Sequence, residues 1–372
     1  MLTIEFALND QGCISLQIVI HKTKICPTCH TEKRHEDFSK YHKTSDGLQH
    51  ECKACNSNTK MLYRKSLNGV LRGLFQHAKS NSKARAKNGR TDVGADELEF
   101  SDLEHLWNQQ NGVCFYSNLP MNYNRNEWKI SLERINPKIG YIKGNIALIC
   151  LELNHSSNWS FDKINEMVTI LDKNIDESFV SFDINMDKDK KNRTKIIKQV
   201  INGEDYYNCT YCNLIKHVDE FPSRINNGCI DCSKILQKQF LETPRGKLLT
   251  LINSAKHNMK SRAKVGNKNR ESSMDIDFDF LVNLYNEQKG LCAYSKIPLQ
   301  FGSYLDKNWT ISLERIDVSK GYMKDNVCLI CYEFNTMDSS LVYKNNEDTG
   351  NSGWTREKFN VFLNSVKMRN HK

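Results

Sequence analysis

The chain contains one unit written twice, and this duplication restricts its possible folds more than any other feature of the sequence. QNGVCFYSNLPM, from Gln110 to Met121, returns as QKGLCAYSKIPL, from Gln288 to Leu299. A longer segment that starts at Trp128, WKISLERINPKIGYIKGNIALICLELN, returns from Trp309 as WTISLERIDVSKGYMKDNVCLICYEFN. All matching segments keep the same order, so both copies are expected to adopt one supersecondary unit. Apolar positions shared by the copies follow from packing alone, whereas shared polar positions point to a site.

Eight of the 14 cysteines form two matched sets of paired Cys-x-x-Cys turns. Four thiolates in two tight turns suit the tetrahedral coordination of Zn²⁺. The sequence therefore predicts two structural zinc ions, one in each of two ribbons, with redox pairs or buried thiols as the alternatives. A bound ion would supply folding energy to segments too short to hold a core of their own. The sets are Cys26, Cys29, Cys52 and Cys55 in the first copy and Cys209, Cys212, Cys229 and Cys232 in the second.

A second group of recurring cysteines lacks the partners of a four-thiol site. Cys114 and Cys150 recur as Cys292 and Cys331. Each copy offers only two sulfurs here, so these thiols are expected to be buried as small hydrophobic side chains.

Polar residues recur around two short strands in each copy. The segment from Ile130 to Ile135 alternates as a strand does, which places Glu133 and Arg134 on opposite faces. After a glycine turn, Asn145 precedes an apolar strand, and a short following helix is expected to carry Asn154. The second copy repeats this order with Glu314, Arg315, Asn326 and Asn335.

These residues offer hard oxygen atoms of the kind that Mg²⁺ prefers, a carboxylate from a strand and an amide oxygen from the element after it. The sequence predicts one Mg²⁺ per copy, held by Glu133 with Asn154 and by Glu314 with Asn335. The alternative is a structural glutamate–arginine ion pair with asparagine caps.

At these residues each copy resembles the HNH, or ββα-metal (His-Me finger), endonucleases. The string ERI…GY…N…N carries the likeness, and the paired Cys-x-x-Cys turns resemble the zinc-ribbon subgroup that includes the restriction endonuclease PacI. The likeness spans each copy from ribbon to closing helix. It implies that the glutamate and the last asparagine hold the metal, that Asn145 and Asn326 brace the loop, and that the chain hydrolyses phosphodiester bonds in DNA.

The likeness breaks at one position. Where ordinary HNH enzymes have a general-base histidine, this chain has Arg134 and Arg315. Arginine cannot accept a proton near pH 7, so it would stabilise charge on the scissile phosphate while metal-bound water or another side chain supplies the base. In the PacI-like subgroup a tyrosine is implicated, which matches Tyr116 and Tyr294, and the neighbouring arginines would activate it. The alternative is that both tyrosines are core aromatics.

Two basic stretches of helical pattern precede these motifs, from Ala78 to Arg90 and from Ala255 to Arg270. Lysine and arginine repeated in register favour contact with phosphates over a merely solvated face. The candidate DNA contacts are Lys79, Lys83, Arg85 and Lys87 in the first copy and Lys256, Lys260, Arg262 and Lys264 in the second.

Charge and hydropathy narrow the classes of function. The 53 lysines and arginines exceed the 44 acidic residues, and the formal charge of +9 suits a polyanionic partner such as double-stranded DNA. No apolar run approaches the about 18 residues of a membrane span, and the first residues lack the pattern of a signal peptide. We therefore expect an intracellular protein, cytoplasmic in a prokaryotic or viral setting and with access to the nucleus in a eukaryote.

The sequence predicts an α+β protein of two tandem modules, each a four-cysteine zinc ribbon followed by a ββα-metal nuclease fold. The expected function is Mg²⁺-dependent, site-specific double-strand cleavage of DNA, of restriction or homing type, by a monomer that acts as a covalent pseudo-dimer. The alternatives are an inactive nucleic-acid-binding protein and a nickase with one active copy. The expected segments are an N-terminal hairpin (1–21), zinc ribbon 1 (22–66), nuclease-like module 1 (67–171), a linker (172–204), zinc ribbon 2 (205–240) and nuclease-like module 2 (241–372).

Overall fold

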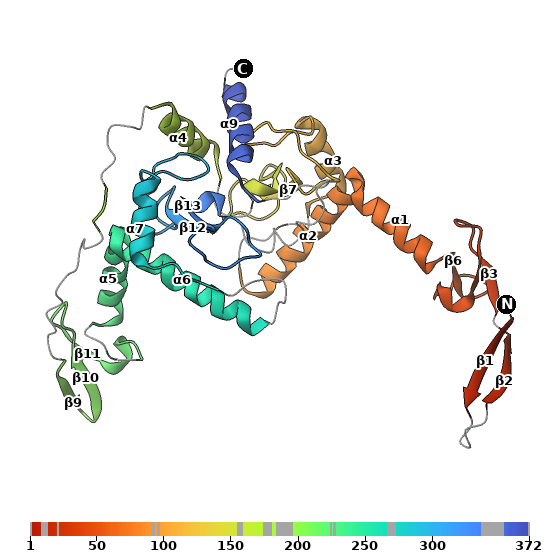
Figure 1. Ribbon diagram of the computed structural model, residues 1–372, viewed down its shortest axis with the longest axis horizontal. Helices are drawn as coiled ribbons and strands as arrows, with labels where there is room; N and C mark the ends of the chain where they lie inside the picture. Colours follow the sequence, from red (N-terminus) through yellow and green to blue (C-terminus); the bar gives the residue numbers. More distant parts are fainter. Residues whose placement is uncertain are drawn as a thin grey trace. The chain divides into compact units, whose positions relative to one another are not determined.

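A computed structural model of the chain describes residues 2–8, 14–20, 22–90, 94, 97–154, 159–173, 181–183, 196–223, 225, 228–265, 273–335 and 353–370. It shows a mixed α+β protein built from short strands and longer helices (Figure 1). The chain forms two compact units. The N-terminal unit holds Met1–Leu106 and Asn136–Asn145, and the C-terminal unit holds Trp107–Ile135 and Ile146–Lys372. No helix in these described ranges is long and apolar enough to cross a membrane.

The N-terminal unit begins with paired strands. Strands β1 (Leu2–Leu8) and β2 (Ile14–Ile20) form an antiparallel pair at the predicted hairpin. In the first ribbon, β3 (Thr23–Ile25) pairs with β4 (Glu32–Arg34), and after the 3₁₀ turn η1 (His35–Asp37), β5 (Phe38–Lys40) pairs with β6 (Leu48–Cys52). Phe38 and Leu48 pack with Cys26 and Cys52 in a small core. So few apolar side chains leave the ribbon dependent on a further source of stability.

Three helices follow the ribbon, α1 (Lys53–Lys65), α2 (Leu67–Lys87) and α3 (Phe100–Gln109). The chain bends sharply between α1 and α2 because Ser66 is extended and its hydroxyl caps α2 by accepting from the N–H of Gly69 at 3.2 Å. A Cβ on Gly69 would lie 1.9 Å from the carbonyl oxygen of Tyr63, so the bend admits only glycine there.

The second ribbon lies in the C-terminal unit, and a bend between two helices follows it as in the first copy. Strands β9 (Lys198–Ile201), β10 (Glu204–Asn208) and β11 (Ile215–His217) form one antiparallel sheet, followed by the 3₁₀ turn η4 (Val218–Glu220) and by helices α5 (Ile230–Glu242) and α6 (Pro244–Val265). Thr243 caps α6 by accepting from the N–H of Gly246 at 3.0 Å. A Cβ on Gly246 would lie 1.8 Å from the carbonyl oxygen of Phe240. The helix bend is therefore a property of the repeated unit.

Each copy then forms an antiparallel pair of five-residue strands. In the first copy β7 (Ile130–Arg134) pairs with β8 (Ile146–Cys150), and the 3₁₀ turn η3 (Leu151–Leu153) follows. In the second copy helix α7 (Phe278–Glu287) precedes β12 (Ile311–Arg315) and β13 (Val327–Cys331), and η5 (Tyr332–Phe334) follows. Every residue of β8 and β13 is buried, which explains their unbroken apolar runs.

The copies end in closing helices, α4 (Phe161–Asp172) and α9 (Arg356–Asn370). Around them lies a buried aromatic cluster that includes Trp159, Trp309, Phe334, Trp354, Phe359 and Phe362. Both strand pairs and both closing helices belong to the C-terminal unit. Elements of both copies therefore pack together in this unit.

Candidate functional site

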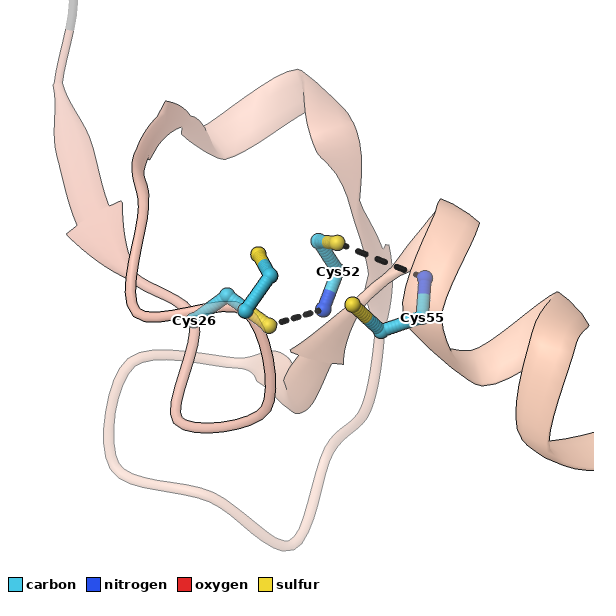
Figure 2. Close-up of side chains that lie close together, drawn as sticks. Cys26, Cys52 and Cys55 are labelled. Atoms are coloured by element: carbon cyan, nitrogen blue, oxygen red, sulfur yellow. Dashed lines mark hydrogen bonds between the residues drawn. The ribbon is translucent and has the colours of Figure 1, made fainter.

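The four cysteines of the first ribbon meet at one point. Their sulfurs all lie within 4.8 Å of one another. Figure 2 shows Cys26, in the turn after β3, facing Cys52 at the end of β6 and Cys55 in the first turn of α1, and the N–H of Cys52 donates to Sγ of Cys26 at 3.3 Å. This hydrogen bond is the largest of several that lower the pKa of Cys26 to about 6, whereas a hydrogen bond with Cys52 and burial raise that of Cys55 to about 12. A thiol that ionises readily is the form of cysteine that binds a metal ion.

The second ribbon has the same arrangement. The sulfurs of Cys209, Cys212, Cys229 and Cys232 also lie within 4.8 Å of one another, and the N–H of Cys229 donates to Sγ of Cys209 at 3.3 Å. His30 in the first ribbon and Asn213 in the second close the turn with a positive φ, 53° and 58°, and each donates its N–H to the carbonyl of the first cysteine at 2.8 Å. The chain thus has two four-cysteine clusters, and the donor set of each fits a structural zinc ion.

The sequence did not reveal that this turn occurs again beside the strand pairs. Asn118, with a φ of 60°, donates its N–H to the carbonyl of Cys114 at 2.8 Å, and the N–H of Cys150 donates to Sγ of Cys114 at 3.4 Å. Ser117 stands where the ribbon has its second cysteine. Both thiols are buried, as predicted, and the CFYS string could have been matched to CPTC as the signal. The turn fixes the backbone that carries Tyr116.

The two asparagines at the strand ends occupy matched positions. Nδ2 of Asn154 donates to Oγ of Ser131 at 2.7 Å and to the carbonyl of Leu132 at 3.2 Å. In the second copy, Nδ2 of Asn335 donates to Ser312 and Leu313 at 2.8 and 3.2 Å. The amide nitrogen is committed to the strand, which leaves Oδ1 as the atom that can face a cation. The helix expected to carry these asparagines is a 3₁₀ turn, and each asparagine is the residue that ends it.

Three of the predicted residues of the second copy meet at a cavity of about 620 Å³, whereas Tyr294 is not among the residues that line it. Glu314, Arg315 and Asn335 line it from the strand pair, and Asn258 and Ser261 line it from α6. A pair of tyrosines, Tyr304 and Tyr332, stacks at the same cavity with ring centroids 4.1 Å apart. One anionic side chain, Glu314, and two cationic ones, Arg315 and Lys247, therefore share one space with several amide and hydroxyl groups and an aromatic surface.

The predicted arginine is anchored in the second copy. Nη1 of Arg315 donates to the carbonyls of Val318 and Lys320 at 2.8 and 3.0 Å, and the guanidinium lies 5.2 Å from the centre of the Tyr322 ring. Only 4% of Arg315 is exposed. Its positive charge is held in place at the cavity wall, which suits a group that orients an anion.

The environment of the predicted glutamate and tyrosine differs from the expectation. Burial raises the pKa of Glu133, with Arg134 opposing the shift. Burial and the charge of Glu133 raise the pKa of Tyr116 to about 12, and burial raises that of Tyr294, with the neighbouring Cys328 and the charge of Glu314 acting in the same direction. The expected activation of the tyrosines by the arginines is therefore not found, because burial and nearby acidic groups act in the opposite direction.

The loop between the strands is braced by one asparagine in each copy. Asn145 accepts from the N–H of Asn136 at 2.9 Å and donates to the carbonyls of Asn136 and Gly140 at 3.1 and 2.9 Å. Asn326 makes the same three hydrogen bonds with Asp317 and Gly321. This bracing role was expected from the family resemblance.

The basic helices present only part of their predicted charge to solvent. Lys83 and Lys87 are exposed, whereas the ammonium of Lys79 lies 4.9 Å from the Phe75 ring centre and the guanidinium of Arg85 lies 5.6 Å from that of Tyr141. In the second copy Lys256 and Lys260 are exposed. The side chains of Arg262 and Lys264 lie outside the described part of the structure.

Comparison with known proteins gives no relative. The chain matches no family model, no curated protein and no solved structure. The assignment of a function therefore depends on the geometry above.

Proposed function

We propose that the chain is a Mg²⁺-dependent DNA endonuclease of the HNH, or ββα-metal, class with PacI-like zinc ribbons, and that each copy carries one phosphodiesterase site. The observation that carries this proposal is the cavity of the second copy, where Glu314, Arg315 and Asn335 meet. The first copy repeats these residues as Glu133, Arg134 and Asn154. The asparagine makes the same two hydrogen bonds in both copies.

The donor atoms fit a magnesium ion. The carboxylate of Glu314 and Oδ1 of Asn335 are hard oxygen donors at the same cavity, and those of Glu133 and Asn154 are their equivalents in the first copy. An ion held there would neutralise charge that builds up on a scissile phosphate. The zinc ions, in contrast, are proposed to stabilise the ribbons and take no part in the chemistry.

The other side chains suit the remaining needs of phosphodiester hydrolysis. The anchored guanidinium of Arg315 can orient a phosphate and stabilise its charge, but it cannot act as the base. The raised pKa of Tyr116 keeps its phenol protonated near neutral pH. A protonated phenol donates a hydrogen bond, so we assign Tyr116 and Tyr294 to donation toward a phosphate or leaving oxygen rather than to proton abstraction.

Two features favour a nucleic acid over a smaller phosphate ester. The tyrosine pair borders the second cavity, and Tyr304 is 51% exposed, so its ring can stack on a base. Exposed lysines on α2 and α6, such as Lys83 and Lys256, can contact backbone phosphates. Double-stranded DNA with one strand at each site is the substrate proposed.

One observation favours the nickase alternative. Glu314 faces Cys328 across the strand pair, whereas Glu133 faces Ala147. The pKa of Cys328 is raised to about 12 by burial and the charge of Glu314, so this thiol stays neutral beside the site. The two sites are thus not identical, and their rates are expected to differ.

Incubation of supercoiled plasmid with the protein tests the proposal. In Mg²⁺ the wild-type chain should produce open-circle and linear DNA, and in EDTA it should produce neither. Glu133→Gln combined with Glu314→Gln should lower cleavage by roughly 100-fold without abolishing DNA binding. Glu242→Gln, at an exposed position at the end of α5, is the matched control and should cleave normally. Binding by the wild-type chain without cleavage in any divalent metal would refute the nuclease and support a binding protein.

A further inference from the structure

A buried glutamate follows the second strand of each copy and accepts from a tryptophan of the same copy. Oε1 of Glu152 accepts from the backbone N–H of Trp128 at 2.8 Å, and Oε1 of Glu333 accepts from that of Trp309 at 3.0 Å. Glu152 is fully buried and Glu333 is 2% exposed. A carboxylate in such surroundings requires a cationic partner.

The cationic partner comes from the other copy in both cases. Lys358 of α9 in the second copy places Nζ 2.6 Å from Oε1 of Glu152, and Lys163 of α4 in the first copy places Nζ 2.9 Å from Oε1 of Glu333. Both lysines are themselves buried, with 7% and 8% of their surface exposed. The ammonium of Lys358 also lies 4.7 Å from the Trp128 ring centre. Two buried ion pairs thus connect the copies in a reciprocal way.

The tryptophan that precedes each closing helix also packs against the other copy. Trp354 packs edge to face on Trp128 at 5.9 Å, and Trp159 packs on Trp309 at 6.0 Å. Nε1 of Trp309 donates to Glu166 of α4 at 3.0 Å. Figure 1 shows α9 close to β7 of the first copy, and the Glu166 contact places α4 against Trp309, which precedes β12 of the second copy.

The end of α9 also contacts the turn that carries Tyr116. Oγ of Ser365 donates to the carbonyl of Ser117 at 2.9 Å, and Nη1 of Arg369 donates to the carbonyl of Tyr116. The guanidinium of Arg369 lies 4.9 Å from the Phe161 ring centre. When the closing segments are aligned on their tryptophans, Ile170 stands at the position of Ser365 in α4. We call the contacts of Ser365 and Arg369 with the turn that carries Tyr116 the clamp. Isoleucine has no hydroxyl, so α4 does not repeat the contact that Ser365 makes.

We propose that the two copies complete each other by exchanging their closing helices, and that the second copy's C-terminal residues hold the tyrosine-bearing turn of the first copy. The surface around Glu152 and Trp128 in the first copy is thus a docking site for α9, the closing helix of the second copy in the same chain. Since each buried carboxylate would otherwise lack its lysine, neither core is complete without the other copy. This proposal concerns folding and positioning and stands whether or not the chain cleaves DNA.

Double-mutant cycles on the full chain test the exchange. Glu152→Gln keeps the acceptor for Trp128 but leaves the buried ammonium of Lys358 with only the partly exposed carboxylate of Glu127, 4.0 Å away, so the unfolding equilibrium constant should rise on the order of 100-fold. Adding Lys358→Met should recover at least about tenfold of this loss. Lys163→Met is the matched control. Its effect on the free energy of unfolding should add to that of Glu152→Gln without coupling, because the two residues belong to different ion pairs. Coupling of Glu152 to Lys163 in place of Lys358 would overturn the exchange.

Hydrogen exchange tests the clamp without relying on large losses of stability. Arg369→Ala should lower protection of the amides of residues 114–119 by about tenfold and leave residues 292–297 of the second copy unchanged. Lys367→Ala, which removes only an exposed ion pair with Asp172, is the control and should change neither segment. Unchanged protection in the Arg369→Ala chain, or an equal loss in both turns, would refute the clamp.

Discussion

Asn326 provides a direct test of how the loop between the strands is held. Its side chain is 4% exposed and makes three hydrogen bonds, accepting from the N–H of Asp317 at 2.8 Å and donating to the carbonyls of Asp317 and Gly321, both at 2.9 Å. Asn326→Ala removes all three. A net contribution of about 1 kcal/mol for each bond gives an expected loss of about 3 kcal/mol in the free energy of unfolding.

The aspartate variant shows whether Asn326 acts through the hydrogen bonds that its amide nitrogen donates or only through its preference for turns. Asn326→Asp keeps the acceptor for the N–H of Asp317 but replaces the amide nitrogen by an oxygen. That oxygen would face two carbonyl oxygens at the 2.9 Å at which Nδ2 now donates. Aspartate should therefore destabilise the chain at least as much as alanine, although aspartate is a good turn residue.

Denaturant unfolding followed by tryptophan fluorescence gives the measurement. Asn145→Ala should show a similar loss, since Asn145 makes the same three bonds in the first copy. Asn253→Ala, at an exposed position on α6, should leave the midpoint nearly unchanged. A well-tolerated Asn326→Asp chain would show that the two donated hydrogen bonds are unimportant and would refute this reasoning.

Three further predictions concern metal, DNA and the tyrosine. Elemental analysis should find two Zn²⁺ per chain and one after Cys26→Ser, and a metal-free yet fully folded wild-type chain would exclude structural zinc. Lys83→Ala with Lys87→Ala should reduce the slope of log affinity against log salt by roughly 1.8, while an unchanged slope would assign both lysines to solvent. Tyr116→Phe should remove one tyrosinate absorbance step near pH 12 and none near pH 10, because the pKa of this phenol is raised to about 12. A raised pKa contributes stability that is present below about pH 10 and is lost as the pH rises through about 12, so a step near 10 would contradict the burial of Tyr116.

The repeat and the cysteine clusters could be predicted because they depend on spacing. Two Cys-x-x-Cys turns bring four sulfurs together whatever the loop between them, and Cys26 and Cys209 lie in such clusters. The strand at Ile130 could be predicted for a similar reason, since alternation and β-branched residues are local properties. The bracing role of Asn145 came from the family resemblance, and the structure has the expected contacts.

The exchange of closing helices could not be predicted from the sequence. Lys163 and Lys358 stand in amphipathic helices, where lysine is normally exposed, and only the fold shows that each is buried against a distant glutamate. The direction of the pKa shift of Tyr116 was missed for a related reason. Sequence shows the neighbouring arginine, whereas the shift depends on burial and on the charge of Glu133.

The central claim, one cutting site per copy, is tested most directly by mapping nicks to strands. Glu133→Ala and Glu314→Ala each remove the carboxylate of one copy and leave the other copy intact. Each variant should convert supercoiled plasmid to open circles, and run-off sequencing should place the two nicks on opposite strands of the same site. Linear product from both variants, or nicks on the same strand, would contradict the account.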